Sequence, residues 1–154
     1  MGGHSSGGLF PGTSGERATS DQAAHEGLSD SGRALVAEAQ SKGVKISPEK
    51  VVGIAKDPNG KIVWIETGHG GDKGSGLAHI IEDHGKQFNR KGVSNTELPR
   101  YLLQAVCTGK VVGRQGTRKV YEFNYNGSRH RVAITVSNNG YIVGANPRSF
   151  PKEN

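Results

Sequence analysis

Cysteine is almost absent from this chain of 154 residues, which contains a single one, Cys107. One thiol cannot form an internal disulfide, and its isolation excludes the structural zinc sites that depend on clustered cysteines. Cys107 follows Val106 in a stretch of helical spacing and has no acid or base nearby in the sequence. We therefore expect it to pack in the interior rather than to act as a nucleophile.

Long apolar runs are also lacking. No segment approaches the length of a transmembrane helix, and the residues after Met1 have neither the charged nor the apolar region of a signal peptide. From the sequence we expect this fragment to be soluble, with no membrane among its partners.

Apolar residues make up only 32% of the chain, which is a low fraction for a compact fold. The shortage is concentrated at the beginning, because residues 1–15 contain six glycines together with serine, threonine and proline. Such a segment cannot bury enough apolar surface to offset the entropy lost on ordering. The sequence therefore predicts a disordered leader or linker over residues 1–22, a peripheral helix over residues 23–44 and one domain over residues 45–150.

Acidic residues are scarce in the second half of the chain. From Lys86 onward there are 12 basic residues against three acidic ones, whereas residues 1–43 carry three basic and five acidic residues. A basic domain is typical of nucleic-acid binders, although a membrane surface or an acidic protein partner would also fit this charge.

Turn and capping signals divide residues 23–109 into helices and one β-hairpin. Ser94 and Glu97 have the spacing of a capping box, which marks the start of the last helix. Residues 47–49 could instead open a short helix before the hairpin. The first expected element is a helix over residues 23–42, with the strongest helical pattern over 32–41. A hairpin follows, formed by strands 51–54 and 62–66 around the turn 57–60. Two further helices are expected, one from Gly76 that ends by Gly92 and one from about Leu98 to Gly109.

The last third of the domain consists of β-branched and aromatic runs separated by Asn-Gly turns. These runs predict an antiparallel meander of strands 118–125, 129–137 and 141–145, with residues 110–114 as a possible fourth strand and a loose tail from Pro147. The expected fold class is α+β, with N-terminal helices followed by a three- to four-stranded antiparallel sheet. Alternation puts Tyr121, Phe123 and Tyr125 on the face that packs against helices, and Arg118, Glu122, Arg131 and Thr135 on the opposite, polar face.

The helix that begins GLAHIIEDH carries two histidines on different sides. His84 falls within the apolar stripe, where a structural histidine is the commoner outcome, while His79 lies on nearly the opposite side near the helix start. The preceding Gly-Ser-Gly of residues 74–76 offers backbone N–H groups that favour an anion. The spacing i, i+5 is poor for two ligands of one metal, so we expect neither a metal site nor any other cofactor.

This order of parts, with the GLAHIIEDH helix, the capping-box helix and the closing stretch VAITVSNNGYIVGANP, resembles the BECR group of small metal-independent ribonucleases. The group includes barnase, EndoU, the colicin tRNA nucleases and RelE, and the likeness is greatest to its phage-type and polymorphic-toxin members. The resemblance covers about residues 45–147, and its most specific part is the pattern G-L-x-H-I-x-x-x-H. Such members commonly form the C-terminus of large bacterial toxins, including effectors of contact-dependent growth inhibition.

The resemblance implies RNA cleavage by attack of a 2′-OH on its neighbouring phosphate, without a metal. This reaction needs a base, an acid and positive donors for the phosphorane. We predict His79 as base or acid and Thr135 as a hydrogen-bond donor, with His84 and Glu122 as second choices. Arg118, Lys73, Arg131 and Arg114 are the predicted phosphate or RNA contacts. Against these roles, Glu122 could simply pair with Arg131 or Arg118, and Thr135 is a good strand former without any function.

The resemblance also implies partners and a setting. We expect RNA as the substrate, with tRNA ahead of mRNA or rRNA, together with a cognate immunity protein of acidic charge and a host translation factor as a further candidate partner. The domain would be secreted or displayed as part of a larger toxin and would act in the cytoplasm of a target cell. The alternative from a different class is a basic module that binds RNA or protein without cutting anything.

Overall fold

The structure, a computed structural model, describes residues 28–150. The leader expected over residues 1–22 lies outside the described residues, as do the first residues of the helix expected from residue 23. Within the described part, helix α2 (Asp30–Ser41) follows Ser29, whose hydroxyl accepts a hydrogen bond of 3.1 Å from the backbone N–H of Gly32. This is the side-chain cap that a helix start requires.

A two-stranded sheet comes next, formed by β1 (Val51–Lys56) and β2 (Ile62–Glu66). The alternative left open for residues 47–49 is also present, because a 3₁₀ helix, η3 (Pro48–Lys50), precedes β1. Helix α2 was expected to be peripheral, and it packs on this hairpin through a cluster of its own. That cluster contains Leu28, Val36, Ala39, Val51, Ile54, Ile62 and Trp64.

The main sheet has four antiparallel strands in the order β3-β4-β5-β6. They are β3 (Lys110–Gln115), β4 (Arg118–Tyr125), β5 (Ser128–Val136) and β6 (Ile142–Arg148). The meander is therefore confirmed together with its fourth strand. The loose tail expected from Pro147 is wrong, because Val132 pairs with Pro147 and Arg131 with Arg148. Proline is tolerated there since β6 is an edge strand.

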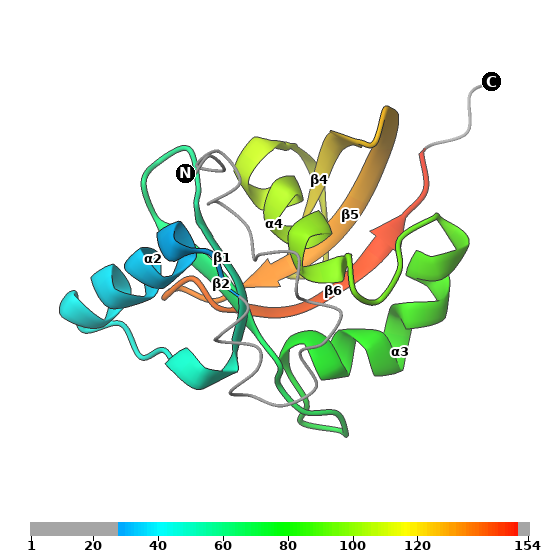
Figure 1. Cartoon of the computed structure of the whole chain (residues 1–154). Helices are drawn as coiled ribbons and strands as arrows, with labels where there is room; N and C mark the ends of the chain where they lie inside the picture. The colour runs from blue at the N-terminus through cyan, green and yellow to red at the C-terminus, as the bar shows by residue number, and fades with distance from the viewer. Residues whose placement is uncertain (1–27, 151–154) are drawn as a thin grey trace.

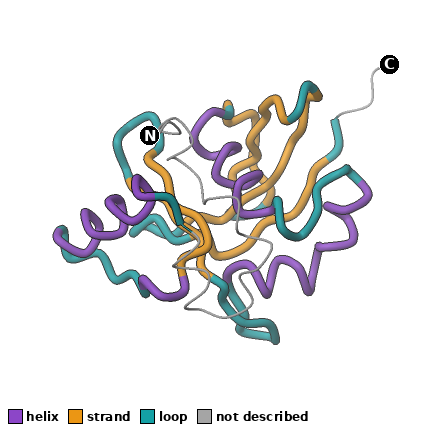
Figure 2. Tube along the Cα trace, in the orientation of Figure 1, coloured by secondary structure: helices purple, strands orange, loops and turns teal. Residues whose placement is uncertain are grey.

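Two helices cover this framework (Figures 1 and 2). Helix α3 (Gly76–Arg90) runs alongside β6, and α4 (Leu98–Thr108) lies over β4 and β5. The capping box before α4 is confirmed: the Ser94 N–H donates to Glu97 Oε1 at 2.8 Å, and the Glu97 N–H donates to Ser94 Oγ at 3.3 Å. None of the described helices is long and apolar enough to cross a membrane.

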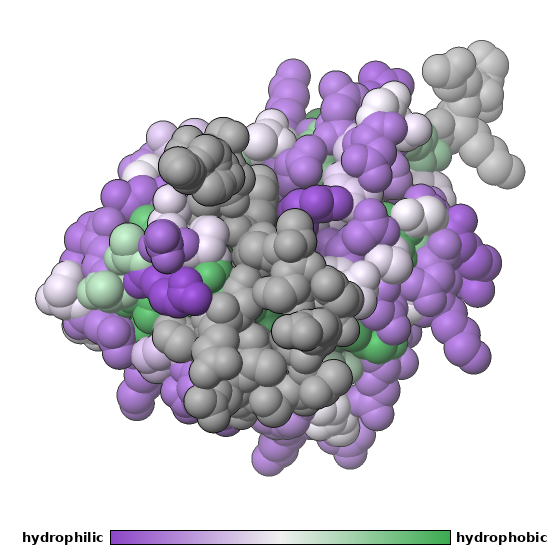
Figure 3. All heavy atoms as spheres, in the orientation of Figure 1, coloured by the Kyte–Doolittle hydropathy of each residue, from purple (hydrophilic) through white to green (hydrophobic). Residues whose placement is uncertain are grey.

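The core between α4 and the sheet contains the aromatic side chains expected from strand alternation. Tyr101 of α4 is fully buried and makes edge-on ring contacts with Phe123 and Tyr125 of β4. Its hydroxyl lies 2.9 Å from Nδ1 of His130 on β5. The opposite face of the sheet is consequently left to polar residues, and most of the described surface visible in Figure 3 is hydrophilic.

Candidate active site

The start of α3 is fixed by contacts from two other parts of the fold. The Ser75 hydroxyl lies 2.8 Å from the Tyr141 hydroxyl at the beginning of the β6 segment, and the Ala78 N–H donates to the Thr67 carbonyl at 2.8 Å. Gly76 has φ +78°, a left-handed conformation that favours glycine. The first turn of α3 is thereby held against both sheets, and this turn carries His79.

His79 is more enclosed than its position on the helix suggested, with a side chain that is 19% exposed. Its Nε2 lies 3.3 Å from Oδ2 of Asp83 one turn later. Its Nδ1 is buried and makes no hydrogen bond to any described residue. A Cβ added at Gly74 would lie 2.8 Å from this nitrogen, so the glycine makes room for the ring. Nε2 is therefore the ring nitrogen that faces a neighbouring polar side chain, whereas Nδ1 is enclosed.

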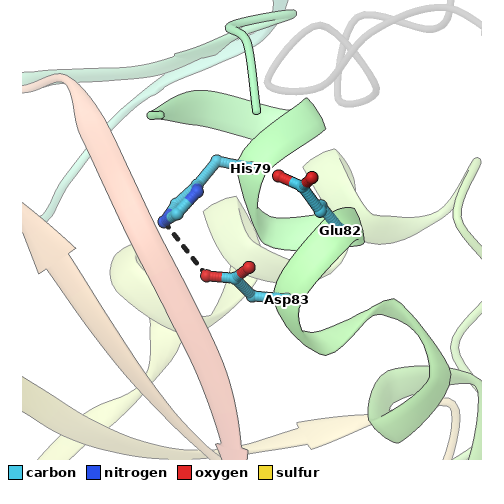
Figure 4. Close-up of side chains that lie close together, drawn as sticks. All are labelled: His79, Glu82 and Asp83. Carbon is cyan, nitrogen blue, oxygen red and sulfur yellow. Dashed lines mark ion pairs between the residues drawn. The ribbon is translucent and has the colours of Figure 1, made fainter. Parts of the chain in front are cut away.

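Asp83 is a site residue that the sequence analysis missed. Figure 4 shows its carboxylate and the His79 ring on the same side of α3, both directed toward the β6 ribbon. The signal was present in the sequence, because residues i and i+4 are neighbours on one helix face. A carboxylate one turn away on the same helix face, 3.3 Å from the ring nitrogen, can hold the orientation of the imidazole ring.

Arg118 reaches from β4 across β5 to β6. Its Nη1 donates to Oδ1 of Asn146 at 2.7 Å, and a Cβ added at Gly144 would lie 2.9 Å from its Nη2. Glycine at position 144 thus leaves space for the guanidinium. Burial lowers the pKa of Arg118 below its ordinary value, and the negative charge of Asp83 opposes this shift. Asp83 therefore interacts with both His79 and Arg118.

Asn146 and Thr135 complete this part of the polar face. Asn146 is a buried polar residue at 8% exposure, and its Nδ2 donates to Oε1 of Gln115 at 2.9 Å. Neither Asn146 nor Gln115 was predicted, since only the strand register brings them to Arg118. Thr135 pairs with Gly144 and follows Ile134, the partner of Lys119, so it occupies the same row of the sheet as Arg118.

Two of the predicted residues lie away from this cluster. Glu122 binds Arg131, whose Nε and Nη2 are both 2.8 Å from Oε1, and it lies about 13 Å along β4 from Arg118 at the usual rise per residue. The pairing considered for Glu122 and Arg131 is thus present. Arg114 pairs with Lys119 rather than with Arg118, and it lines a groove together with Arg131 and Arg148, so its predicted role as an RNA contact stays a prediction.

His84 is not the buried histidine that the apolar stripe suggested. Its side chain is partly exposed, and its Nδ1 lies 2.6 Å from Oε1 of Gln87. His84 lies between the buried Ile80 and Phe88 on the same side of α3, yet its own side chain stays partly exposed. Lys73 is exposed in the loop before α3, one residue before the glycine that adjoins His79.

His79, Glu82 and Asp83 are the described residues that could hold a cation together. One ligand atom from each lies within 4.8 Å of the others, and Figure 4 shows the three side chains close together on α3. Glu82 already has another role, since its Oε1 accepts a hydrogen bond of 2.8 Å from the N–H of Gly71. Both carboxylates are exposed, and exposed acidic pairs are common without a metal. The expected absence of a metal stays a prediction.

The arrangement brings a histidine–aspartate pair beside an arginine that is held by an asparagine. Such a cluster contains a group that can exchange a proton and donors that can stabilise negative charge. No protein-family model and no curated protein matches this chain. The chemistry of the site has to be inferred from its own residues.

Proposed function

We propose that this domain is a metal-independent endoribonuclease. The observation that carries the proposal is that the His79–Asp83 pair of α3 is directed toward β6, the strand whose Asn146 binds Arg118. Proton exchange and phosphate binding are the two capacities that RNA transesterification needs. The groups that provide these two capacities lie on the polar face of the domain. The second half of the chain also carries a large excess of basic residues, which favours binding of RNA.

In the proposed reaction, the imidazole of His79 takes the proton from a ribose 2′-OH, and the Asp83 carboxylate beside it stabilises the imidazolium that forms. The 2′-oxygen forms a bond to the neighbouring phosphorus, and the bond from phosphorus to the 5′-oxygen breaks. The leaving oxygen takes up a proton from water, and His79 returns its proton to the solvent, which gives a 5′-OH and a 2′,3′-cyclic phosphate. Arg118 and the hydroxyl of Thr135 donate to the phosphorane oxygens, where fixed donors are most effective.

The setting of the activity rests on the resemblance to BECR toxins. A ribonuclease delivered into neighbouring cells requires a cognate immunity protein in the producer, and the basic charge of the domain favours an acidic one. We propose tRNA as the leading substrate, with mRNA or rRNA as the alternative within the same class, and a host translation factor as a candidate partner. The domain would act in the target-cell cytoplasm as part of a secreted or displayed toxin.

The test is incubation of the purified protein with total RNA in EDTA, followed by analysis of the ends. Discrete fragments with cyclic phosphate are the expected result, and mapping of those ends would distinguish tRNA from the other RNAs. A gel shift without cleavage would identify a binding module instead. Cleavage that disappears in EDTA and returns with added Mg²⁺ would contradict the metal-free mechanism and direct attention to His79, Glu82 and Asp83.

A further inference from the structure

A groove lies on the polar face of the main sheet, and the β4 residue that lines it is Val120, two residues after Arg118. Its volume is about 540 Å³. It is lined by residues of β3, β4, β5 and β6 and by the segment that follows β6. The charged and aromatic residues that line it are Arg114, Arg131, Arg148 and Phe150, of which the last three are used below.

Arg129 and Arg131 are held in place beside this groove. Arg131 is 22% exposed and its guanidinium binds Glu122, while Nη1 of Arg129 lies 3.6 Å from the same carboxylate. The two guanidinium carbons lie 5.2 and 5.0 Å from the centroid of the Phe150 ring. These distances are within the range of cation–π attraction, which is stronger for arginine fixed against an aromatic ring. One carboxylate and one ring thus orient two arginines.

Basic charge at the groove exceeds what Glu122 can neutralise. Arg148 pairs with Arg131 in the sheet register, so both side chains lie on the same face. Arg148 is exposed, and among the described residues no carboxylate forms an ion pair with it. Phe150 is 39% exposed, which is unusual for a large apolar side chain in this structure. Arginines next to an exposed ring are what a polynucleotide needs, because phosphates bind the guanidinium and bases stack on rings.

The groove is also close to the proposed reaction centre. Arg148 and Asn146 are two residues apart on β6 and point to the same face, which separates them by about 7 Å. Asn146 holds Arg118 through a hydrogen bond of 2.7 Å. An RNA strand whose scissile phosphate lies at Arg118 could therefore continue along β6 to Arg148.

We propose that this arginine groove binds a phosphodiester of single-stranded RNA next to the scissile one, with Arg148 and Arg131 as the phosphate donors and Phe150 as a support for the arginines and an adjoining base. The inference rests on the proposed ribonuclease function for its substrate. It assigns to Arg148 and Phe150 a role that neither the strand pattern nor the resemblance indicated.

The test measures binding separately from cleavage. A 2′-O-methyl oligonucleotide lacks the nucleophile and cannot be cut, so its affinity is measured by fluorescence anisotropy over a series of salt concentrations. Arg148→Ala should weaken binding severalfold at low salt and reduce the slope of log affinity against log salt by about 0.7, the value for one phosphate contact with a single strand. Phe150→Ala should weaken binding too, whereas Phe150→Tyr, which keeps the ring, should not.

Lys119→Ala is the matched control, because Lys119 is exposed, loses the same charge and alternates to the face opposite Arg118. Equal losses for Lys119→Ala and Arg148→Ala would overturn the groove as the binding site. A second control replaces the oligonucleotide with poly-glutamate of the same charge. If the protein binds poly-glutamate with the same affinity and the same salt dependence as the oligonucleotide, the nucleic-acid assignment is overturned and an acidic protein partner is favoured.

The experiment also distinguishes failure of the groove proposal from failure of the proposed ribonuclease function. If the wild type binds the modified oligonucleotide through Arg148 but never cuts the unmodified one, the proposed function is wrong and the groove stands. If the wild type cuts the unmodified oligonucleotide and Arg148→Ala binds as tightly as the wild type, only the groove is wrong.

Discussion

His79 makes a sharp test at the level of a single residue, since its Nε2 faces Asp83 while its Nδ1 is buried. We predict that His79→Ala reduces RNA cleavage by about 10²- to 10⁴-fold, the usual effect of losing an acid–base group. The helix should remain, because His79 lies on the side of α3 away from Ile80 and Phe88, which the core buries. Cleavage of a labelled RNA and the thermal midpoint should be measured on the same preparation.

His84→Ala is the matched histidine control on the same helix. The sequence alone led us to expect a loss of 1 to 3 kcal/mol from a buried histidine. With a partly exposed side chain bonded to Gln87, we now expect a cost of at most about 1 kcal/mol and nearly normal cleavage. If His84→Ala proved folded but inactive while His79→Ala cut normally, the assignment of the catalytic histidine would have to be exchanged.

Asp83 provides a second test of the same pair. Asp83→Asn keeps the shape of the side chain but removes the charge that stabilises an imidazolium and that influences Arg118. We predict a fall in kcat of about 10-fold or more with an RNA affinity that is unchanged or tighter, because a negative charge has left a phosphate site. Single-turnover cleavage and anisotropy separate the two effects. A loss confined to affinity would place Asp83 outside the chemistry.

At the level of elements, the signals that the sequence carried reliably were local ones. The capping box of Ser94 and Glu97 and the turn at Asn126 and Gly127 involve residues close together in the chain, so their chemistry specifies the structure there. Alternation along β4 and β5 likewise identified the core face. These features are sufficient to specify an α+β fold with a terminal meander.

The features that the sequence did not predict depend on tertiary contacts between residues far apart in the chain, which no local sequence pattern contains. The register of β3 pairs Gln115 with Arg118, and the register of β6 brings Asn146 within reach of the Arg118 guanidinium. His84 is partly exposed although the apolar spacing of α3 includes it, because burial depends on which elements pack against that turn. The sequence thus predicted which kinds of side chain the candidate site contains, but it identified only some of the residues that form the site.

The contact between the two sheets, where Gly140 approaches β2, leads to a further prediction. The Trp64 N–H donates to the Gly140 carbonyl at 2.9 Å, and Gly140 has φ +105° with no room for a Cβ beside the Ile62 carbonyl. Gly140→Ala should therefore lower the free energy of unfolding by more than the roughly 1 kcal/mol that a left-handed alanine costs. Fluorescence of Trp64, the only tryptophan, should report the unfolding.

Gly60→Ala separates the two contributions, because Gly60 has φ +84° and open space around it. The difference between the variants measures the steric conflict at the contact between the two sheets. If both substitutions cost the same, the close approach of Gly140 to β2 does not constrain the fold.

For the molecule as a whole, stability should decline on mild acidification because of His130. Burial lowers its pKa below the ordinary value of 6.5, so the unfolded chain binds more protons than the folded one below about pH 6.5. The contribution is complete above that pH and is lost as the pH falls toward the folded-state pKa. Urea unfolding at pH 7.5 and 5.5 should show the decrease, and His130→Gln should make it smaller. An unchanged pH dependence in His130→Gln would assign the effect to other groups.

The charge of the whole molecule leads to the last prediction. A formal net charge of +6, with the excess in the second half of the chain, attracts an acidic partner over distances longer than any contact. Exposed charges are screened beyond about 10 Å at 0.1 M salt, so the rate of association with a neutralising protein encoded beside this one should fall steeply with ionic strength while dissociation changes little. Stopped-flow measurements over a salt series would test this. A tight neutralising partner that is itself basic, or whose association rate is indifferent to salt, would show that recognition does not use the basic face.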